Sequence, residues 1–342
     1  MPTDSVPRYP ICYRSDEIRL ICQLALRGES LGLVGIAGVG KSNLVNYLRV
    51  GKSFKSQYFG LGVDKVHFCV VGGSAWGGTT ESLWSQMLSA LGPITKSVSP
   101  PEAMVIPFAD EDRALSRLQA WLARLCQESG YRIVYILDDF DNVILKGPLS
   151  MLDQLSELRS CGNRGFLSYV VFTKLLPHVL GKSYDIEKSS KFYDLIRHNI
   201  YALEPYTAGD ALQMLKHLNA GAGGLLHHKD LIEIYRLAGG HGQLLKTVFQ
   251  LLAEERTTSE DAIRRLAEHP DVQQECQRII AGLHEQEQQV AWRAARGNLL
   301  AEDWDTVDHL VRRRLVTVSA RAVTWFSPLM ASFLQTWEPP EA

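Results

Sequence analysis

The sequence lacks the features of disulfide-stabilised, zinc-binding and membrane-spanning proteins. No CxxC pair occurs in its 342 residues, and the six cysteines lie far apart, at Cys12, Cys22, Cys69, Cys126, Cys161 and Cys276. A disulfide framework or a structural zinc site is therefore not expected, and the thiols should be reduced. The N-terminus MPTDSVPRYP has no apolar signal core, and no stretch approaches the roughly 18 apolar residues of a membrane span. We therefore expect a cytoplasmic protein with no membrane partner.

The chain also lacks an excess of either charge. Lysine and arginine number 36 and aspartate and glutamate 38, which gives a net charge of −2. This balance does not favour a protein that holds nucleic acid constantly by neutralising phosphates, although a local basic face is compatible with it. The length and the hydrophobic content of 46% suffice for more than one core, so two or three domains are expected.

What the sequence does contain is a predicted phosphate-binding loop, within LVGIAGVGKSNLVNYL from Leu33. An apolar strand over 31–34 precedes the pattern Gly-x-x-x-x-Gly-Lys-Ser, and a helix over about 41–48 follows it. Glycines let several N–H groups converge on one anion, and the helix adds its positive N-terminal end. Lys41 is expected to reach the β and γ phosphates of a nucleotide, and Ser42 to ligate Mg²⁺. The predicted nucleotide-binding residues of this loop are Gly35, Ile36, Ala37, Gly38, Val39, Gly40, Lys41, Ser42 and Asn43.

A pair of carboxylates follows a second buried strand, in YRIVYILDDFD. Residues 133–137 are continuously apolar, as expected of a central strand in a parallel sheet that is covered on both faces. Carboxylates at the C-terminal end of such a strand point into the crevice where α/β sheets bind ligands. Asp138 is expected to hold Mg²⁺ through an outer-sphere contact, and Asp139 to orient or activate water. We interpret Asp141 as a structural cap or turn residue.

Two further segments extend this pattern into a family resemblance. CYRSDEIRLICQLAL resembles the GREEEL box of the AAA+-related STAND and archaeal-type P-loop ATPases, which include relatives of the origin-recognition ATPases. Tyr13 replaces the glycine of that box and Arg14 matches its arginine. GFLSYVVFTK resembles the sensor-1 strand of the same ATPases, with Thr173 and Lys174 at its polar end. The resemblance implies that Arg14 contacts the nucleotide and that Thr173 and Lys174 sense the γ-phosphate.

Two later segments continue the resemblance in the same order as in the family. IYALEPYTAGDALQML resembles a strand followed by an LxPL segment, so Pro205 would border the base. LAGGHGQLLKTVFQLL resembles the GGxPxxL start of a lid helix, with Gly242 in place of the proline. The resemblance implies ATP with Mg²⁺ as cofactors, and adenine is also favoured because no guanine-binding NKxD segment follows the sensor strand. It further implies an α/β P-loop core with a parallel sheet, followed by a helical lid and a C-terminal winged helix.

The expected organisation is a core over residues 1–204, a lid over 205–272 and a winged helix over 273–342. In the core we predict a strand over 66–71, helices over 79–91, 110–128 and 148–159, and an exposed loop over 92–109. In the lid we predict helices over 207–218, 229–237, 243–255 and 259–268. His227 and His228 lie in a polar loop without other ligands nearby in sequence, so we interpret them as solvated.

The C-terminal 60 or so residues predict two helices, in QQVAWRAARG and DWDTVDHLVRRRL, and then a hairpin. In the hairpin, Val316 and Val318 should face Val323 and Trp325. Winged helices often contact DNA through the second helix. Here that helix begins with Glu302, Asp303 and Asp305, and its basic residues, Arg312, Arg313 and Arg314, lie at its C-terminal end, with Arg321 at the wing tip. This distribution favours a domain that packs on the ATPase and senses its nucleotide, with DNA contact as the alternative.

Two functions of different classes fit these motifs. The first is a nucleotide-dependent switch that binds ATP or ADP, hydrolyses ATP slowly or on stimulation by a partner, and signals to a separate effector protein or by self-association. The second is a DNA-associated ATPase of the origin-recognition or transposition-helper kind. A nucleotide-binding protein without hydrolytic activity is a third, weaker hypothesis. The absence of a repeat array, protease or nuclease segment in the sequence leads us to expect that any effector is a separate chain.

Overall fold

A computed structural model describes residue 9 and residues 12–51, 53–101, 113–255, 265–320 and 322–339. Contacts between residues divide the chain into two compact units. The first contains residues 1–15, 35–41 and 202–342, and the second contains residues 16–34 and 42–201. Each unit therefore gathers segments that are distant in sequence, and each is described by itself.

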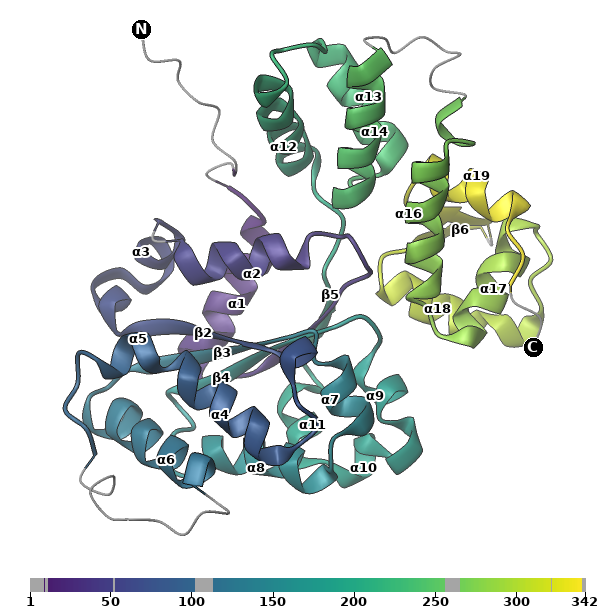
Figure 1. The fold of residues 1–342 in the computed structure, drawn as a ribbon. Coiled ribbons are helices and arrows are strands. Elements are labelled where there is room, and N and C mark those ends of the chain that lie inside the picture. Colours follow the sequence, from purple (N-terminus) through teal and green to yellow (C-terminus); the bar gives the residue numbers. More distant parts are fainter. Residues whose placement is uncertain are drawn as a thin grey trace, which may run out of the picture. The chain divides into compact units, whose positions relative to one another are not determined.

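The second unit is built on a five-stranded sheet with the order β2-β3-β4-β1-β5 (Figure 1). Its strands are β1 (Leu31–Val34), β2 (Val66–Gly72), β3 (Arg132–Asp138), β4 (Leu167–Thr173) and β5 (Ile200–Ala202). The pairs β2–β3, β3–β4 and β1–β4 are parallel, with Gly72 opposite Asp138 and Val34 opposite Thr173. The strands predicted over 31–34, 66–71 and 133–137 and within 165–174 are thereby confirmed.

Helices cover both faces of this sheet, as Figure 1 shows. They are α1 (Ser15–Arg27), α2 (Lys41–Val50), α3 (Ser53–Phe59), α4 (Thr80–Ala90), α5 (Gly92–Thr95), α6 (Arg113–Leu122), α7 (Asp141–Lys146), α8 (Leu149–Ser160), α9 (Pro177–Leu180), α10 (Ile186–Ser189) and α11 (Lys191–Ile196), with a π-helical segment over Ala123–Glu128. The helices predicted over 79–91 and 148–159 are confirmed, as is the described part of the one over 110–128. Thr79 caps α4, since its Oγ1 accepts the Ser82 N–H at 3.2 Å.

The loop predicted over 92–109 is wrong at its start. Residues 92–95 form the short helix α5, with Pro93 in its first turn. Proline favours this position because its fixed φ suits a helix and its missing N–H would have no intrahelical partner there. Residues 102–109 of the predicted loop lie outside the described residues.

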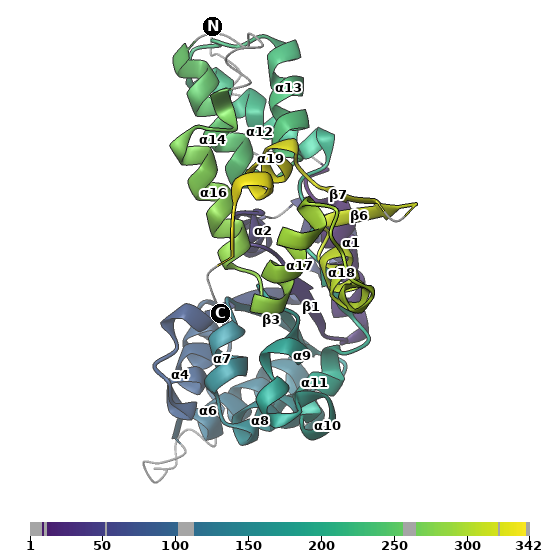
Figure 2. The ribbon, with the colours of Figure 1, turned by 90° about the vertical axis from the view of Figure 1, so that its right-hand side faces the viewer.

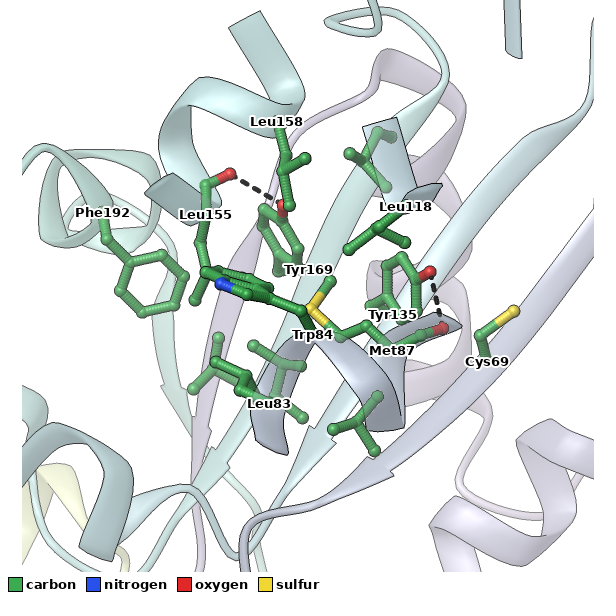
Figure 3. Close-up of a cluster of buried hydrophobic side chains, with 14 of the residues drawn as sticks. Cys69, Leu83, Trp84, Met87, Leu118, Tyr135, Leu155, Leu158, Tyr169 and Phe192 are labelled. Atoms are coloured by element: carbon green, nitrogen blue, oxygen red, sulfur yellow. Dashed lines mark hydrogen bonds between the residues drawn. The ribbon is translucent and has the colours of Figure 1, made fainter. Parts of the chain in front are cut away.

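The core of this unit follows the two-residue alternation of its strands. On one face, Ile133, Tyr135 and Leu137 of β3 join Leu167, Tyr169 and Val171 of β4 beneath α4, α6, α8 and α11. Figure 3 shows Trp84 and Met87 packed beside both tyrosines. The Tyr135 hydroxyl donates to the Met87 carbonyl at 3.0 Å, and the Tyr169 hydroxyl to the Leu155 carbonyl at 2.7 Å. Burial raises the pKa of both tyrosines, so both hydroxyls stay protonated donors.

The first unit consists mainly of helices and one hairpin. Its elements are α12 (Ala208–Gly221), α13 (His228–Ala238), α14 (Gly242–Glu255), α16 (Pro270–Ala281), α17 (Glu285–Ala295), α18 (Trp304–Arg312), β6 (Val316–Ser319), β7 (Ala322–Trp325) and α19 (Pro328–Thr336). Helices α12, α13 and α14 contact one another and lie side by side in Figures 1 and 2. The three predicted lid helices that fall on them are confirmed. Of the helix predicted over 259–268, residues 259–264 lie outside the described residues.

We call residues 285–336 the C-terminal segment. It contains the helices α17 and α18, then the antiparallel hairpin of β6 and β7, and then α19 (Figure 2). In the hairpin, Val316 pairs with Trp325 and Val318 with Val323, so the predicted register is confirmed. Arg321 lies outside the described residues. The division into domains over 1–204, 205–272 and 273–342 stays a prediction, and α16 runs across its second boundary.

No disulfide joins the six cysteines, all of which the structure describes, in agreement with the expectation from their spacing. Burial raises the pKa of Cys22, Cys69, Cys126 and Cys276 to about 12, which leaves these thiols protonated and unreactive at neutral pH.

Among the described residues, none of the helices combines the length and the apolar character that a membrane crossing requires.

The buried tyrosine hydroxyls give a test of this core. Tyr169→Phe should lower the free energy of unfolding by about 1 kcal/mol, because it removes one buried hydrogen bond while keeping the ring. Tyr201→Phe, on an exposed ring, is the control and should stay within about 0.5 kcal/mol of the wild type. Chemical denaturation monitored by tryptophan fluorescence measures both, and equal effects would contradict the packing described.

Candidate functional site

The glycine-rich loop of residues 35–41 connects β1 to α2, so the predicted strand and helix on either side are both present. Gly38 and Gly40 have φ values of 77° and 107°, a region that side chains with a Cβ rarely adopt. Lys41 is buried, and its Nζ donates to the Gly35 carbonyl at 2.8 Å. Ser42 lies exposed in the first turn of α2. Two positions of the loop therefore have backbone conformations that favour glycine.

Three successive carbonyl groups of this loop are held from outside the loop. The Ala37 oxygen lies 2.7 Å from His241 Nε2, the Gly38 oxygen accepts the Gln243 N–H at 3.0 Å, and the Val39 oxygen accepts from Arg14 Nη2 at 2.9 Å. A trans peptide is planar, with its N–H directed opposite to its C=O. Fixing the Ala37 and Val39 carbonyls therefore also fixes the directions of the Gly38 and Gly40 N–H groups, while the Val39 N–H turns back to the Ile36 oxygen at 3.4 Å.

Arg14 is a buried junction between the loop and the segment that leads into α12. Its Nη1 donates to the Glu204 carbonyl at 3.1 Å, and its guanidinium lies 4.4 Å from the centre of the Tyr206 ring. Its backbone N–H donates to the Asp210 carboxylate at 3.2 Å, and its φ of 42° is uncommon for a residue with a side chain. The predicted nucleotide-contacting Arg14 thus contacts the loop through the backbone of Val39.

His241 is a fully buried residue that the sequence analysis did not select. Its Nδ1 accepts the Leu244 N–H at 3.3 Å, and this bond caps the start of α14. Because Nδ1 accepts, the imidazole is neutral and Nε2 carries the hydrogen that is donated to the Ala37 carbonyl. Desolvation by burial lowers the pKa of His241 to about 4; the hydrogen bond to Ala37 opposes this shift, and the charges of Arg278 and Lys41 add to it. The only signal in the sequence was its position within GGHG, at the variable residue of the lid motif.

Close backbone packing explains the glycines around this junction. A Cβ on Gly40 would lie 2.5 Å from the Tyr206 hydroxyl, and one on Gly242 would lie 3.1 Å from both the Gly38 oxygen and the Tyr206 ring. Gly242, which stands in place of the family's proline, therefore lets α14 begin directly against the loop. The Tyr206 N–H donates to the Gly240 carbonyl at 2.8 Å, and Pro205 lies beside Gly240 as well.

The predicted acidic pair ends β3 in the second unit. Asp138 is the last residue of the strand, and its Oδ1 accepts the Asp139 N–H at 3.0 Å. Asp139 has a φ of 48°, a left-handed conformation that aspartate tolerates better than most residues. A Cβ on Gly73 would lie 2.4 Å from the backbone carbonyl oxygen of Asp139, so the turn after β2 packs directly on the Asp139 backbone. Both aspartates are half-buried and lie at the carboxyl edge of the sheet.

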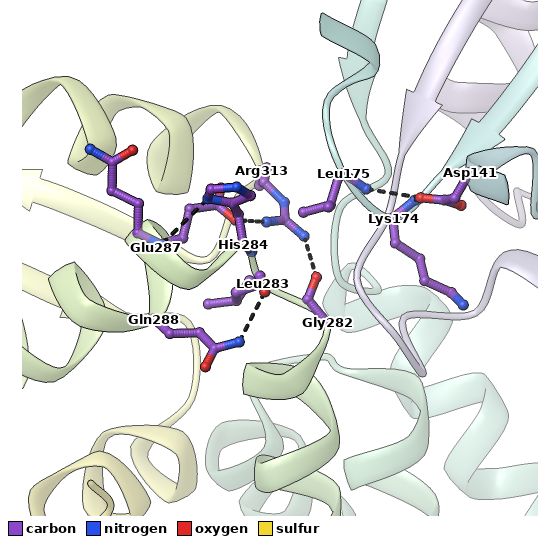
Figure 4. A network of polar contacts seen from close by, with 10 residues as sticks. Asp141, Lys174, Leu175, Gly282, Leu283, His284, Glu287, Gln288 and Arg313 are labelled. Atoms are coloured by element: carbon purple, nitrogen blue, oxygen red, sulfur yellow. Dashed lines mark hydrogen bonds and ion pairs between the residues drawn. The ribbon is translucent and has the colours of Figure 1, made fainter. Parts of the chain in front are cut away.

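The end of β4 lies beside that turn. Thr173 is the last residue of β4 and is 1% exposed, and no described residue forms a hydrogen bond with its Oγ1. Phe140 N–H donates to the Phe172 carbonyl at 2.9 Å, and Asp141 Oδ1 accepts from Lys174 N–H at 2.8 Å and Leu175 N–H at 3.3 Å (Figure 4). Asp141 is therefore a structural residue, as predicted, that joins the acidic turn to the predicted sensor strand.

The carboxyl ends of neighbouring strands thus carry the predicted groups. Val34, after which the loop begins, lies opposite Thr173 in the sheet, and Asp138 ends the next strand beyond β4. Asn43 follows Ser42 in α2. Within the described ranges, no cluster of three histidine, cysteine, aspartate or glutamate residues is placed to hold a metal ion. His227 and His228, which we interpreted as solvated, lie at the start of α13.

Searches with family descriptions and with curated proteins find no match. Solved structures do match along nearly the whole chain. A Walker-type ATPase of Pyrococcus abyssi superposes with a TM-score of 0.59 at 15% identity, over 94% of this chain and 95% of its own. The ORC2 protein of Aeropyrum pernix, in ADPNP–ADP complexes, gives a TM-score of 0.56 at 15% identity, over 98% of this chain and 96% of its own. The chain therefore has the fold of the P-loop ATPases, with a parallel five-stranded sheet, and the predicted fold class is confirmed.

His241 predicts a pH dependence of stability. Its folded pKa of about 4 lies below the ordinary 6.5, so the unfolded chain binds a proton in this interval that the folded chain does not. The stabilisation is complete above pH 6.5 and is lost as the pH falls towards 4, by about 3 kcal/mol in all. We expect His241→Asn to remove this contribution, as measured by urea unfolding from pH 4 to 7.5. His228→Asn, at the exposed start of α13, is the control, and an unchanged pH profile in the His241 variant would disprove the assignment.

Proposed function

We propose that this protein is an ATP-binding, slowly hydrolysing P-loop ATPase of the AAA+ and STAND type that acts as a nucleotide-dependent switch. The observation that carries the proposal is the loop of residues 35–41, in which the bonded Ala37 and Val39 carbonyls fix the directions of the Gly38 and Gly40 N–H groups. Converging N–H groups at a helix N-terminus, with a lysine beside them, suit a triphosphate. The P-loop ATPase fold supports the same conclusion.

The residues present fit ATP and Mg²⁺. Gly38 and Gly40 allow the positive φ values of the loop, and the Lys41 Nζ can exchange the Gly35 carbonyl for a phosphate oxygen. Ser42 and Asp138 are the proposed magnesium residues, directly and through water respectively. Magnesium, when bound, neutralises charge on the β and γ phosphates. Because Mg²⁺ is usually held by one or two carboxylates together with phosphate oxygens, a preformed cluster of protein ligands is not required.

For hydrolysis, Asp139 is the proposed residue that orients the attacking water and accepts its proton. The buried Thr173 hydroxyl, which has no partner among the described residues, is a suitable donor to a γ-phosphate oxygen. Lys174 would add positive charge nearby. Asp139 is one methylene shorter than the glutamate of many AAA+ relatives, so basal turnover should be below about 1 per second, at the low end of enzyme rates. Arg14 and Pro205 are proposed to contact the nucleotide. The family resemblance is the reason for proposing adenine as its base.

The switch requires that two states differ in their affinity for the nucleotide. Helix α14 holds the loop through His241 and Gln243, so a phosphate at the Gly38 N–H acts on the same Ala37–Gly38 peptide that His241 holds. A separate effector protein, or a second copy of this chain, would detect the change. The effector protein and the second copy of this chain are both proposed partners.

The basic residues of the C-terminal segment favour this function over DNA binding. Arg313 is buried and paired with Glu287, and it donates to the Gly282 carbonyl at 3.4 Å (Figure 4). Arg312 pairs with Asp308 at 2.8 Å, and Arg314 with Glu204 at 2.9 Å. Three of the four arginines considered for phosphate contact are thus engaged by carboxylates. The alternative, a DNA-associated ATPase, keeps the order of helix, helix and hairpin in its favour.

Binding and hydrolysis should separate by mutation. Lys41→Ala should weaken the affinity for ATP by about 10- to 100-fold, because a charged hydrogen bond to phosphate contributes about 1.5–3 kcal/mol to binding. Asp139→Asn should retain Mg-ATP affinity while turnover falls, and Asp138→Asn should also weaken Mg²⁺ retention. Calorimetric titration and phosphate release measure these quantities. Lys146→Ala, exposed at the end of α7, is the control, and unchanged ATP affinity in Lys41→Ala would refute the proposed site.

The two functions differ in their response to duplex DNA. Replacing Arg312 and Arg314 with glutamate should leave duplex affinity weak and little changed, and should alter the ATPase rate through the lost Glu204 pair. Arg313 is left intact because breaking its buried ion pair would destabilise the fold. Fluorescence anisotropy with labelled duplex at physiological salt is the measurement. Submicromolar binding that both substitutions abolish would favour the DNA-associated ATPase.

A further inference from the structure

His241 contacts three parts of the first unit at once. Its Nε2 donates to the loop at Ala37, its Nδ1 caps α14 at Leu244, and its ring lies 5.8 Å from that of Phe326 in the C-terminal segment. A buried ring held at both nitrogens has little rotational freedom. An imidazolium would present an Nδ1–H to the Leu244 N–H, two donors facing each other, so only the neutral form satisfies all the contacts.

The corner between α13 and α14 is packed rigidly on the C-terminal segment. Gly239 has a φ of 59°, and a Cβ there would lie 1.9 Å from the Phe326 carbonyl oxygen. The fully buried Ser327 donates from its hydroxyl to the Leu237 carbonyl at 2.7 Å. Phe326 N–H donates in turn to the Leu315 carbonyl at 3.0 Å. The corner therefore cannot shift relative to residues 326–327 without losing these contacts.

We propose that His241 is a positioning residue that holds the phosphate-binding loop in shape and couples its occupancy to the C-terminal segment. This inference rests on the proposed nucleotide site. A phosphate that bonds the Gly38 N–H polarises and fixes the same peptide whose carbonyl accepts from His241. Nucleotide binding and the His241 contact must then strengthen each other, because coupling between two binding events is reciprocal. The corner carries the effect to Phe326 and Ser327.

Two substitutions separate the two hydrogen bonds of His241. His241→Asn can keep the cap, since its Oδ1 can take the place of Nδ1, but its side chain is too short to reach the Ala37 carbonyl. His241→Gln extends an amide NH₂ towards Ala37 and is a poorer cap. Lys246→Ala, at an exposed position of the same helix α14, is the matched control.

We expect His241→Asn to weaken Mg-ATP binding by about 10-fold, the worth of one hydrogen bond, with α14 still folded. His241→Gln should recover most of the ATP affinity while its melting temperature falls, a pattern that a purely structural role would not produce. In hydrogen exchange, ATP should protect the amides of residues 237–244 and those of residues 326, 327, 329 and 330 in the wild type. That protection at 326–330 should be absent in the asparagine variant.

The outcomes distinguish this inference from the proposed function. If the wild type and Lys41→Ala both fail to bind ATP, the nucleotide site is wrong and the inference falls with it. If the wild type binds ATP, Lys41→Ala binds it more weakly and His241→Asn binds it as tightly as the wild type, only the role of His241 is overturned. Unchanged ATP protection of residues 326–330 in His241→Asn overturns the coupling in the same way.

Discussion

The planarity of the peptide group is the constraint on which the candidate site depends. Three consecutive carbonyls of the loop, those of Ala37, Gly38 and Val39, are satisfied by groups from outside it. His241, Gln243 and Arg14 do this at three consecutive peptides, and the N–H directions of Gly38 and Gly40 follow. Preorganised donors need little rearrangement when an anion arrives, which is how such a loop can bind phosphate strongly.

The parallel sheet provides the second constraint, because it brings strand ends that are distant in sequence to one edge. Asp138 and Thr173 are 35 positions apart in numbering, yet they end neighbouring strands. The left-handed Asp139 is maintained by its surroundings, since Gly73 packs on its carbonyl and Phe140 and Asp141 bond the end of β4. Strain of this kind persists only where neighbouring contacts determine the backbone, and it is frequent at functional sites.

The arginines at the end of α18 illustrate what a local sequence pattern leaves open. In the sequence they form one basic run, and either a helix-dipole role or DNA contact is consistent with it. In the structure they differ completely: Arg313 is buried against Glu287, whereas Arg312 and Arg314 are exposed and pair with Asp308 and Glu204. Glu204 is 110 positions away in numbering, so no local pattern could have revealed that pair.

The sequence by itself determined the strands, most of the helices, the hairpin register and the glycine-rich loop with its flanking elements. These features follow from hydrophobic periodicity and from the conformational freedom of glycine, which act over a few residues. Tertiary structure alone decided that His241 is neutral and hydrogen-bonded at both ring nitrogens, and that Arg14 holds the loop through Val39. It also supplies the reason for glycine at position 242, where α14 begins against the loop. The physical reason is that burial and hydrogen-bond partners are set by contacts between segments some 200 residues apart, as between Ala37 and His241.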